Sequence, residues 1–192
     1  MFGSLHGGAA HAHWWTHVAA TFSRQYRIVA IDLSGHGDSE HRDTYSLEQW
    51  SREVMAVADD AGIAGPPVII GHSMGGFVTI ATAALHSDRL AGVIVVDSPV
   101  AEPDAEIGAA QAKQAFGVPK VYPTLDDALV RFRTVPRQEN DLPYVIHHVA
   151  RRSVRQVDGG WSWKFDHNLF SAFTSSIRAV ALPYLPEVKA LK

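Results

Sequence analysis

The first half of the chain alternates short, continuous apolar runs with segments of helical periodicity. The runs are rich in Val and Ile and occupy residues 27–32, 67–71 and 91–97. Runs of this kind, bounded by polar residues and glycines, are typical of strands buried on both faces. Between them, residues 46–61 place apolar side chains on one helical face, with Ser46 as a candidate N-cap, and residues 74–86 form an alanine-rich helical segment. The order strand, helix, strand, helix, strand predicts an α/β fold whose parallel sheet is covered by helices.

The pattern changes after Pro99. Amphipathic helical stretches are expected near residues 105–116, 124–133 and 142–154, and the second of these opens on Thr124 and Asp127, a possible capping box. Residues 156–163 predict a small hairpin around Asp158-Gly159. We therefore expect a core at residues 1–99, a mostly helical lid over the sheet at residues 100–167, and a return helix with a connector toward a further strand at residues 168–192.

Composition and charge limit which molecules the chain is expected to bind. The chain has 192 residues, 46% of them hydrophobic, with 17 Lys+Arg against 20 Asp+Glu, so the formal net charge is −3. No basic run exceeds Arg151-Arg152, which gives no electrostatic reason to expect a nucleic acid or an anionic membrane as partner. The absence of cysteine excludes a thiol nucleophile and Cys-ligated zinc. We expect a small uncharged ligand, no membrane span, and the cytoplasm as the default location.

The segment Gly71-His72-Ser73-Met74-Gly75 fits the G-x-S-x-G pattern at the junction between an apolar run and a helical segment. A serine on so sharp a turn has close backbone neighbours, so the flanking positions must be glycine. The turn would hold its hydroxyl at the carboxyl edge of the sheet, above a helix N-terminus. There the backbone N–H of Met74 could stabilise a developing oxyanion.

Three further motifs accompany this turn in a fixed order. They are Leu5-His6-Gly7-Gly8, Asp32-Leu33-Ser34-Gly35-His36-Gly37-Asp38-Ser39 and Val95-Val96-Asp97-Ser98-Pro99. Together with Gly71–Gly76 they resemble the α/β-hydrolase fold superfamily, in its lid-bearing, esterase-like branch. The resemblance covers residues 5–99 by motif. It implies Ser73 as nucleophile and the backbone N–H groups of Gly8 and Met74 as an oxyanion hole.

The resemblance also implies a histidine base and a carboxylate that orients it, in the chain order Ser, Asp/Glu, His. Nothing after Ser98 matches the acid turn or the histidine loop. Asp97 is a candidate acid because some relatives place the acid there; the alternative is a capping or loop-bonding carboxylate. No histidine can be assigned as the base. His72 is expected to pack beneath Ser73, His6 and His36 to be structural, and only weak candidates remain in His147, His148 and His167.

The family's sheet order also raises a question about the N-terminus. The resemblance implies a strand before His6, lying between the first two predicted strands, yet only Met1 to Leu5 precede this histidine. We expect that slot to be unfilled and the 192 residues to be a fragment of a hydrolase, because an empty slot leaves backbone groups unpaired at about 1–3 kcal/mol each if buried.

A metal site is a weaker hypothesis. His11, His13 and His17 lie within seven residues, but a binuclear metallohydrolase pattern needs an aspartate where Trp15 stands. We expect neither metal nor cofactor here, and instead a helix with Trp14, Val18 and Phe22 facing inward.

The leading functional hypothesis is a hydrolase of carboxylic esters or related bonds, acting through a Ser73 acyl-enzyme on a small apolar substrate. The pocket could be lined by Trp161, Trp163, Phe116 and Tyr144, although aromatic residues in a lid more often form the lid's own core. Two alternatives stay open: a ligand-binding receptor on the same fold, and an inactive truncated product. Serine instead of aspartate at position 73 argues against the haloalkane dehalogenase and epoxide hydrolase chemistries of this superfamily. The sequence does not indicate an oligomeric state.

Overall fold

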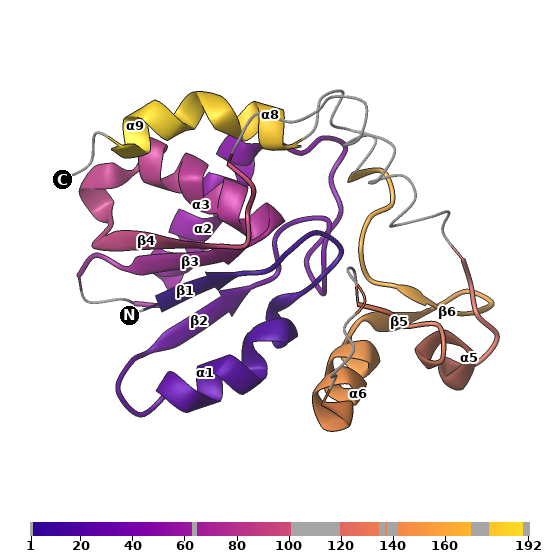
Figure 1. The fold of residues 1–192 in the computed structure, drawn as a ribbon. Coiled ribbons are helices and arrows are strands. Elements are labelled where there is room, and N and C mark those ends of the chain that lie inside the picture. The colour runs from indigo at the N-terminus through magenta and orange to yellow at the C-terminus, as the bar shows by residue number, and fades with distance from the viewer. Residues whose placement is uncertain are drawn as a thin grey trace.

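A parallel sheet of four strands forms the core of the protein (Figure 1). The computed structural model describes residues 2–62, 65–100, 120–134, 137, 142–169 and 177–189. The strands are β1 (Phe2–Leu5), β2 (Ile28–Ile31), β3 (Val68–His72) and β4 (Gly92–Val96), and their spatial order is β2-β1-β3-β4. The three strands expected from the apolar runs are therefore present, and the α/β class with a parallel sheet is confirmed.

The predicted empty slot is wrong, because β1 fills it. Leu5 pairs with Ile31 on one side and with Gly71 on the other. The segment Phe2–Leu5 contains no β-branched residue, so its own sequence hardly signals a strand. Its extended conformation follows from the two neighbours, whose backbone groups would otherwise be left unpaired.

Two long helices pack on the sheet. α2 (Leu47–Asp60) begins at Ser46, whose side chain accepts a hydrogen bond from the N–H of Gln49, as predicted. α3 (Met74–Leu85) follows β3 without a loop and is buried from Met74 to Ala83. Figure 1 shows both helices on one side of the sheet and α1 (Thr16–Phe22) on the other.

The C-terminal segment differs from the prediction. α8 (Ile177–Ala181), a 3-10 helix η3 (Leu182–Tyr184) and α9 (Leu185–Lys189) lie over α3 in Figure 1, where a connector was expected from residue 182. The apolar side chains of Tyr184, Leu185 and Val188 pack against the core cluster, which explains why this segment is helical. Of the helix expected at residues 168–179, the described residues show Leu169 and Ile177–Ala179 as helical, and residues 170–176 lie outside the described residues.

Helix α1 also differs from the prediction. Val18 and Phe22 were expected to face inward, but they are 37% and 45% exposed. The 3-10 helix η1 (Ala12–Trp15), directly before α1, contacts β1 and β2. Val18 and Phe22 of α1 are therefore not buried as expected.

Strand β4 was expected to be buried, but its C-terminal half is exposed, with Ile94 at 46%. β4 lies at the end of the strand order and pairs only with β3, so in the described part of the chain one of its edges has no neighbour. An apolar run predicts a buried strand only where neighbouring strands and helices cover it. In the described part of the chain this edge of the sheet is not covered.

The second half of the described chain adds α5 (Leu125–Leu129), α6 (Pro143–Arg152) and a hairpin of β5 (Val154–Val157) and β6 (Gly160–Trp163). The capping box between Thr124 and Asp127 and the hairpin at Asp158-Gly159 are both confirmed. Figure 1 shows these elements beyond the carboxyl ends of the core strands. The helix expected at residues 105–116 lies outside the described residues. None of the helices within the described ranges is long and apolar enough to cross a bilayer.

Candidate active site

Ser73 stands at the sharp turn between β3 and α3 with a strained backbone. Its φ of 52° and ψ of −116° lie in a region that residues with a side chain rarely adopt. Such conformations cost on the order of 1–3 kcal/mol and persist only where the surrounding structure holds them. Here the Ser73 N–H donates to the Val96 carbonyl at 3.0 Å, and the Ser73 carbonyl accepts from Ser98 Oγ at 2.7 Å. Residues at and just after the end of β4 therefore hold the backbone of Ser73 through both its N–H and its carbonyl group.

The glycines of the motif are required by contacts between backbones. A Cβ on Gly71 would lie 2.1 Å from the Gly75 carbonyl oxygen, and a Cβ on Gly75 would lie 2.6 Å from the His6 carbonyl oxygen. Real Cβ atoms do not approach this closely, and a backbone oxygen cannot move aside as a flexible side chain can. The spacing of these glycines thus allows β3, α3 and the end of β1 to meet directly beneath Ser73.

The loop His6-Gly7-Gly8 lies against the serine. A Cβ on Gly7 would lie 3.4 Å from Ser73 Cβ and 3.3 Å from His72 Nδ1, both within van der Waals reach. Met74, the residue after the serine, is the first residue of α3, where backbone N–H groups have no partner within the helix. The structure therefore brings the segment of Gly8 and the N-terminus of α3 to the same serine.

Asp97 lies at the end of β4, one residue after the carbonyl that binds Ser73. Its backbone has a φ of 50°, and its carboxylate Oδ2 is 4.0 Å from His72 Nε2. The Asp97 side chain is 86% exposed. Asp97 is thus close to the turn and paired with His72, whose ring lies beside Gly7.

The described histidines do not supply a base at Ser73. Within the described ranges, the hydroxyl of Ser73 makes no hydrogen bond to a histidine ring. His6 and His36 are buried in the core with ring centroids 4.8 Å apart, and burial lowers the pKa of both. Among the weak candidates, His147 is exposed on α6, His148 packs beside His13, and His167 packs beside Phe165.

His11 was not foreseen as a structural residue. Its Nε2 lies 2.9 Å from Ser153 Oγ and 3.2 Å from the Val149 carbonyl, so the ring joins the loop after β1 to the end of α6. Burial lowers the pKa of His11 to about 4. No group of three or more His, Asp or Glu side chains in the described part of the chain is arranged to hold a metal ion.

The aromatic residues expected to line a pocket lie apart from one another. Trp163 packs against Tyr122 and Phe132 at centroid distances of 5.9 and 6.3 Å, and Trp161 carries the guanidinium of Arg151 over its ring. Tyr144 is 71% exposed on α6, and Phe116 lies outside the described residues. Tyr122, Phe132 and Trp163 thus form a partly buried aromatic cluster within residues 120–169, which we call the second unit. A hollow of about 320 Å³ lies elsewhere, at Pro67 and Arg89, next to the start of β3 and away from Ser73.

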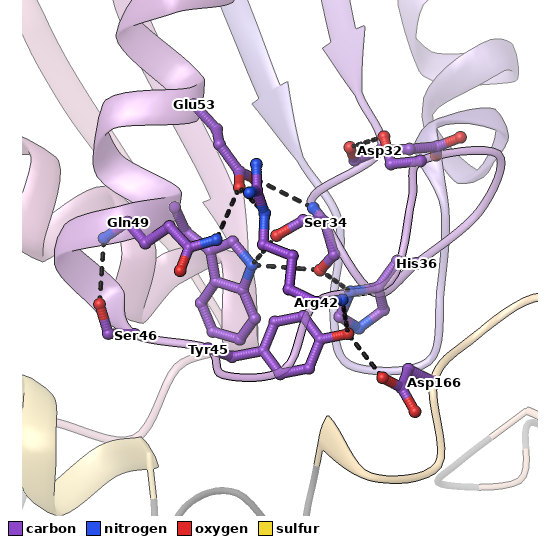
Figure 2. Close-up of polar contacts among 11 residues, drawn as sticks. Asp32, Ser34, His36, Arg42, Tyr45, Ser46, Gln49, Glu53 and Asp166 are labelled. Atoms are coloured by element: carbon purple, nitrogen blue, oxygen red, sulfur yellow. Dashed lines mark hydrogen bonds and ion pairs between the residues drawn. The ribbon is translucent and has the colours of Figure 1, made fainter.

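A polar network ties the second unit to the core, and no local motif of the sequence predicted it. Tyr45 Oη donates to Asp166 Oδ2 at 2.6 Å (Figure 2). The N–H of Asp166 donates to the Gly35 carbonyl at 2.8 Å. Lys164 Nζ adds an ion pair with Asp38 at 2.6 Å. Burial and the neighbouring Asp166 carboxylate raise the pKa of Tyr45 to about 12, so its hydroxyl stays a donor. These contacts fix where residues 164–166 lie relative to the loop after β2.

The same loop is held from the core side. Asp32 accepts from the N–H of Ala12 at 2.6 Å and from the N–H of Asp38 at 2.8 Å. Figure 2 also shows Glu53 of α2 at the centre of a second set of contacts, with its carboxylate accepting from Ser34 N–H and from Arg42 Nε. The motif from Asp32 to Ser39 therefore connects η1, α2 and residues 164–166 through its hydrogen bonds and its ion pair.

Comparison with known proteins agrees with this fold. A family model described as the alpha/beta hydrolase fold matches residues 4–137. Protein phosphatase methylesterase 1 of Mus musculus is 39% identical over 134 residues, which are 65% of this chain and 34% of that protein. Epoxide hydrolase 4 of Mus musculus is 31% identical over 98 residues, 50% of this chain and 27% of that protein. The solved thioesterase domain from the curacin biosynthetic pathway has a TM-score of 0.77 at 23% identity, covering 100% of this chain and 71% of that one. The chain thus spans about a third or less of the length of these two curated relatives.

Proposed function

Because the chain belongs to the α/β-hydrolase fold family, we propose that the protein carrying it is a serine hydrolase that cleaves a carboxylic ester of a small apolar substrate through an acyl-enzyme on Ser73. The observation that carries this proposal is the turn itself. Ser73 combines a positive φ, flanking glycines in backbone contact, a helix N-terminus directly after it and the His-Gly-Gly loop against it. A glycine-rich turn with only a structural role would need neither the helix N-terminus nor the His-Gly-Gly loop next to a serine.

The proposed reaction begins at the serine. Ser73 Oγ attacks the ester carbonyl carbon while its proton passes to a general base, and the carbonyl oxygen becomes an oxyanion. The N–H groups of Met74 and Gly8 stabilise that oxyanion, each donor being worth on the order of 3 kcal/mol in the transition state. As the intermediate collapses, the C–O bond to the leaving group breaks and the base returns the proton to the departing oxygen, which leaves as the alcohol. The remaining acyl-enzyme is hydrolysed by water, which gives the acid and free Ser73. The base is a histidine in the family resemblance, and we assign none of the described histidines to this role.

Asp97 is our candidate for the carboxylate that orients such a base. Its position after β4 supports this role, because the preceding residue, Val96, is hydrogen-bonded to Ser73. Its carboxylate is exposed and accessible to a histidine ring. The alternative role is the pairing with His72, which would make Asp97 a structural carboxylate of the turn.

We further propose that residues 100–167 form a lid over this site, with Trp161 and Trp163 on its hairpin and Tyr144 on α6 as candidates for substrate contact. The network of Tyr45 and Asp166 supports this role, since it anchors the second unit beside the carboxyl ends of the strands. Among the relatives, one is named a methylesterase, which favours an ester as the substrate class. Another is named an epoxide hydrolase, but that chemistry uses a carboxylate nucleophile in this superfamily, and Ser73 stands at that position here.

Turnover of a panel of short-chain aryl and methyl esters tests the proposal. We expect Ser73→Ala to abolish hydrolysis, because the remaining oxyanion donors alone give only a small residual rate. Ser87→Ala is the matched control, since Ser87 is an exposed serine in the 3-10 helix Ser87–Arg89 at the other end of α3, and it should leave turnover unchanged. Undiminished hydrolysis by Ser73→Ala would overturn the assignment.

A ligand-binding protein on the same fold is the second candidate. It is favoured by one observation, that no described histidine is hydrogen-bonded to Ser73. In that case ester analogues would bind with slow or no turnover in both the unaltered protein and Ser73→Ala, and the two would bind them equally well.

A further inference from the structure

The peptide group between Gly7 and Gly8 is held in one orientation by two donors. The Gly7 carbonyl oxygen lies 2.7 Å from His6 Nδ1 and 3.2 Å from the N–H of Ala10. In a trans peptide, the C=O of one residue and the N–H of the next point in opposite directions. Since His6 is buried beneath the loop, the N–H of Gly8 points away from the buried ring.

The tautomer of His6 follows from its other hydrogen bond. The backbone N–H of Leu33 donates to His6 Nε2 at 3.2 Å, so Nε2 must be the acceptor. A neutral imidazole with a free lone pair on Nε2 carries its proton on Nδ1. Nδ1–H is therefore the donor to the Gly7 carbonyl, and the strand end at Leu33 sets which nitrogen holds the proton.

The surroundings keep this arrangement in place. Only 1% of His6 is exposed, and the His36 ring packs on it at 4.8 Å, so water cannot replace either partner. Burial lowers the pKa of His6, which keeps the ring neutral at physiological pH and preserves the lone pair that Leu33 needs. Gly7 itself lies against Ser73, so a rotation of its peptide would change what the serine faces.

We propose that His6 is the positioning residue of the oxyanion hole: its Nδ1–H holds the Gly7 carbonyl and thereby presents the Gly8 N–H to the oxyanion formed on Ser73. This inference rests on the proposed function and assigns to His6 a role in orienting one donor. His6 does not touch the substrate. If the Gly7 peptide rotated, the site would present a carbonyl oxygen where the oxyanion forms, and catalysis would lose a donor and gain a repulsive group.

Three substitutions at position 6 separate this role from simple packing. Asn places an amide N–H near the position of Nδ1, Gln reaches toward the position of Nε2, and Leu fills space without a donor. We expect His6→Gln and His6→Leu to lower kcat at least about tenfold, toward the 10²–10³ that removal of one oxyanion donor costs, with KM changed by less than about threefold. His6→Asn should keep kcat within about threefold of the unaltered protein. Each kcat is expressed per serine titrated with a fluorophosphonate, so that an unfolded fraction does not enter the result.

A packing role would lower the titratable fraction in all three variants and leave kcat per site unchanged; that result, or an equal fall for Asn and Gln, overturns the inference. Ser73→Ala in the same assay keeps the two claims apart. Turnover surviving in Ser73→Ala removes the proposed function, whereas its loss together with a flat His6 series removes only the role of His6.

A measurement on the unaltered protein covers the case in which the variants do not fold. With ¹⁵N-glycine labelling, the amide proton of Gly8 should move downfield when phenylboronic acid forms its anionic adduct on Ser73. An unmoved Gly8 resonance in a protein whose Ser73 is occupied by the boronate contradicts the inference.

Discussion

Protonation of His11 is expected to weaken the fold as pH falls. His11 is 2% exposed, its Nε2 contacts Ser153 and Val149, and its Nδ1 has no partner among the described residues. A charged ring here would lose its hydration and would have no hydrogen bond to a carboxylate to compensate. Burial accordingly lowers the pKa of His11 from 6.5 to about 4 in the folded chain.

The sign and size of the effect follow by linkage. The unfolded chain binds a proton near pH 6.5 and the folded chain only near pH 4, so the stabilisation is fully present above pH 6.5 and is lost between pH 6.5 and about 4. A difference of about 2.5 pH units at about 1.4 kcal/mol each corresponds to about 3 kcal/mol from this residue. That is a large share of the roughly 5–15 kcal/mol that stabilises a typical domain.

The assay is urea unfolding followed by tryptophan fluorescence at several pH values from 7 to 4, for the unaltered chain and for His11→Gln. Gln can donate to the same oxygens without titrating. From pH 7 to 4, the free energy of unfolding of His11→Gln should therefore fall by about 3 kcal/mol less than that of the unaltered chain. His17→Gln, at an exposed histidine of α1, is the control and should behave as the unaltered chain does. Parallel curves for His11→Gln and the unaltered chain, or a gain in stability toward pH 4, would refute the reasoning.

Three further substitutions test the contacts around the site. Gly75→Ala places a Cβ 2.6 Å from a backbone oxygen of His6, so we expect a loss of about 2 kcal/mol or more in thermal unfolding together with slower labelling of Ser73; unchanged labelling would contradict the packing argument. Tyr45→Phe removes the donor to the buried carboxylate of Asp166 and should cost about 1–3 kcal/mol, measured by urea unfolding, whereas a neutral result would mean that this contact does not anchor the second unit. Asp97→Asn should lower kcat by about 10⁴-fold if Asp97 orients the base, and a change confined to stability assigns it to its pairing with His72.

The features that sequence reasoning predicted well are local ones. The turn at Ser73, the cap at Ser46 and the capping box at Thr124 each depend on residues within a few positions of one another, so spacing and side-chain chemistry decide them. The burial of the sheet was only partly predicted. The apolar run at β4 indicated a strand, but its exposure depends on which elements lie next to an edge strand.

The features that were missed depend on distant partners. Residues Phe2–Leu5 become a strand only because β2 and β3 pair with them on both sides. The Tyr45–Asp166 and His11–Ser153 contacts join residues 121 and 142 positions apart, and nothing in either local segment indicates the partner. The helices from Ile177 to Lys189 are shaped by packing on α3, which overrides the prolines that favoured a connector.

The proposal that Ser73 is the nucleophile can be tested directly by mass spectrometry after incubation with a fluorophosphonate probe. In the protein carrying this chain we expect one adduct per molecule, located by peptide mapping to Gly71–Gly75, and none in Ser73→Ala. An adduct on another residue, or equal labelling of Ser73→Ala, would contradict the proposed acyl-enzyme.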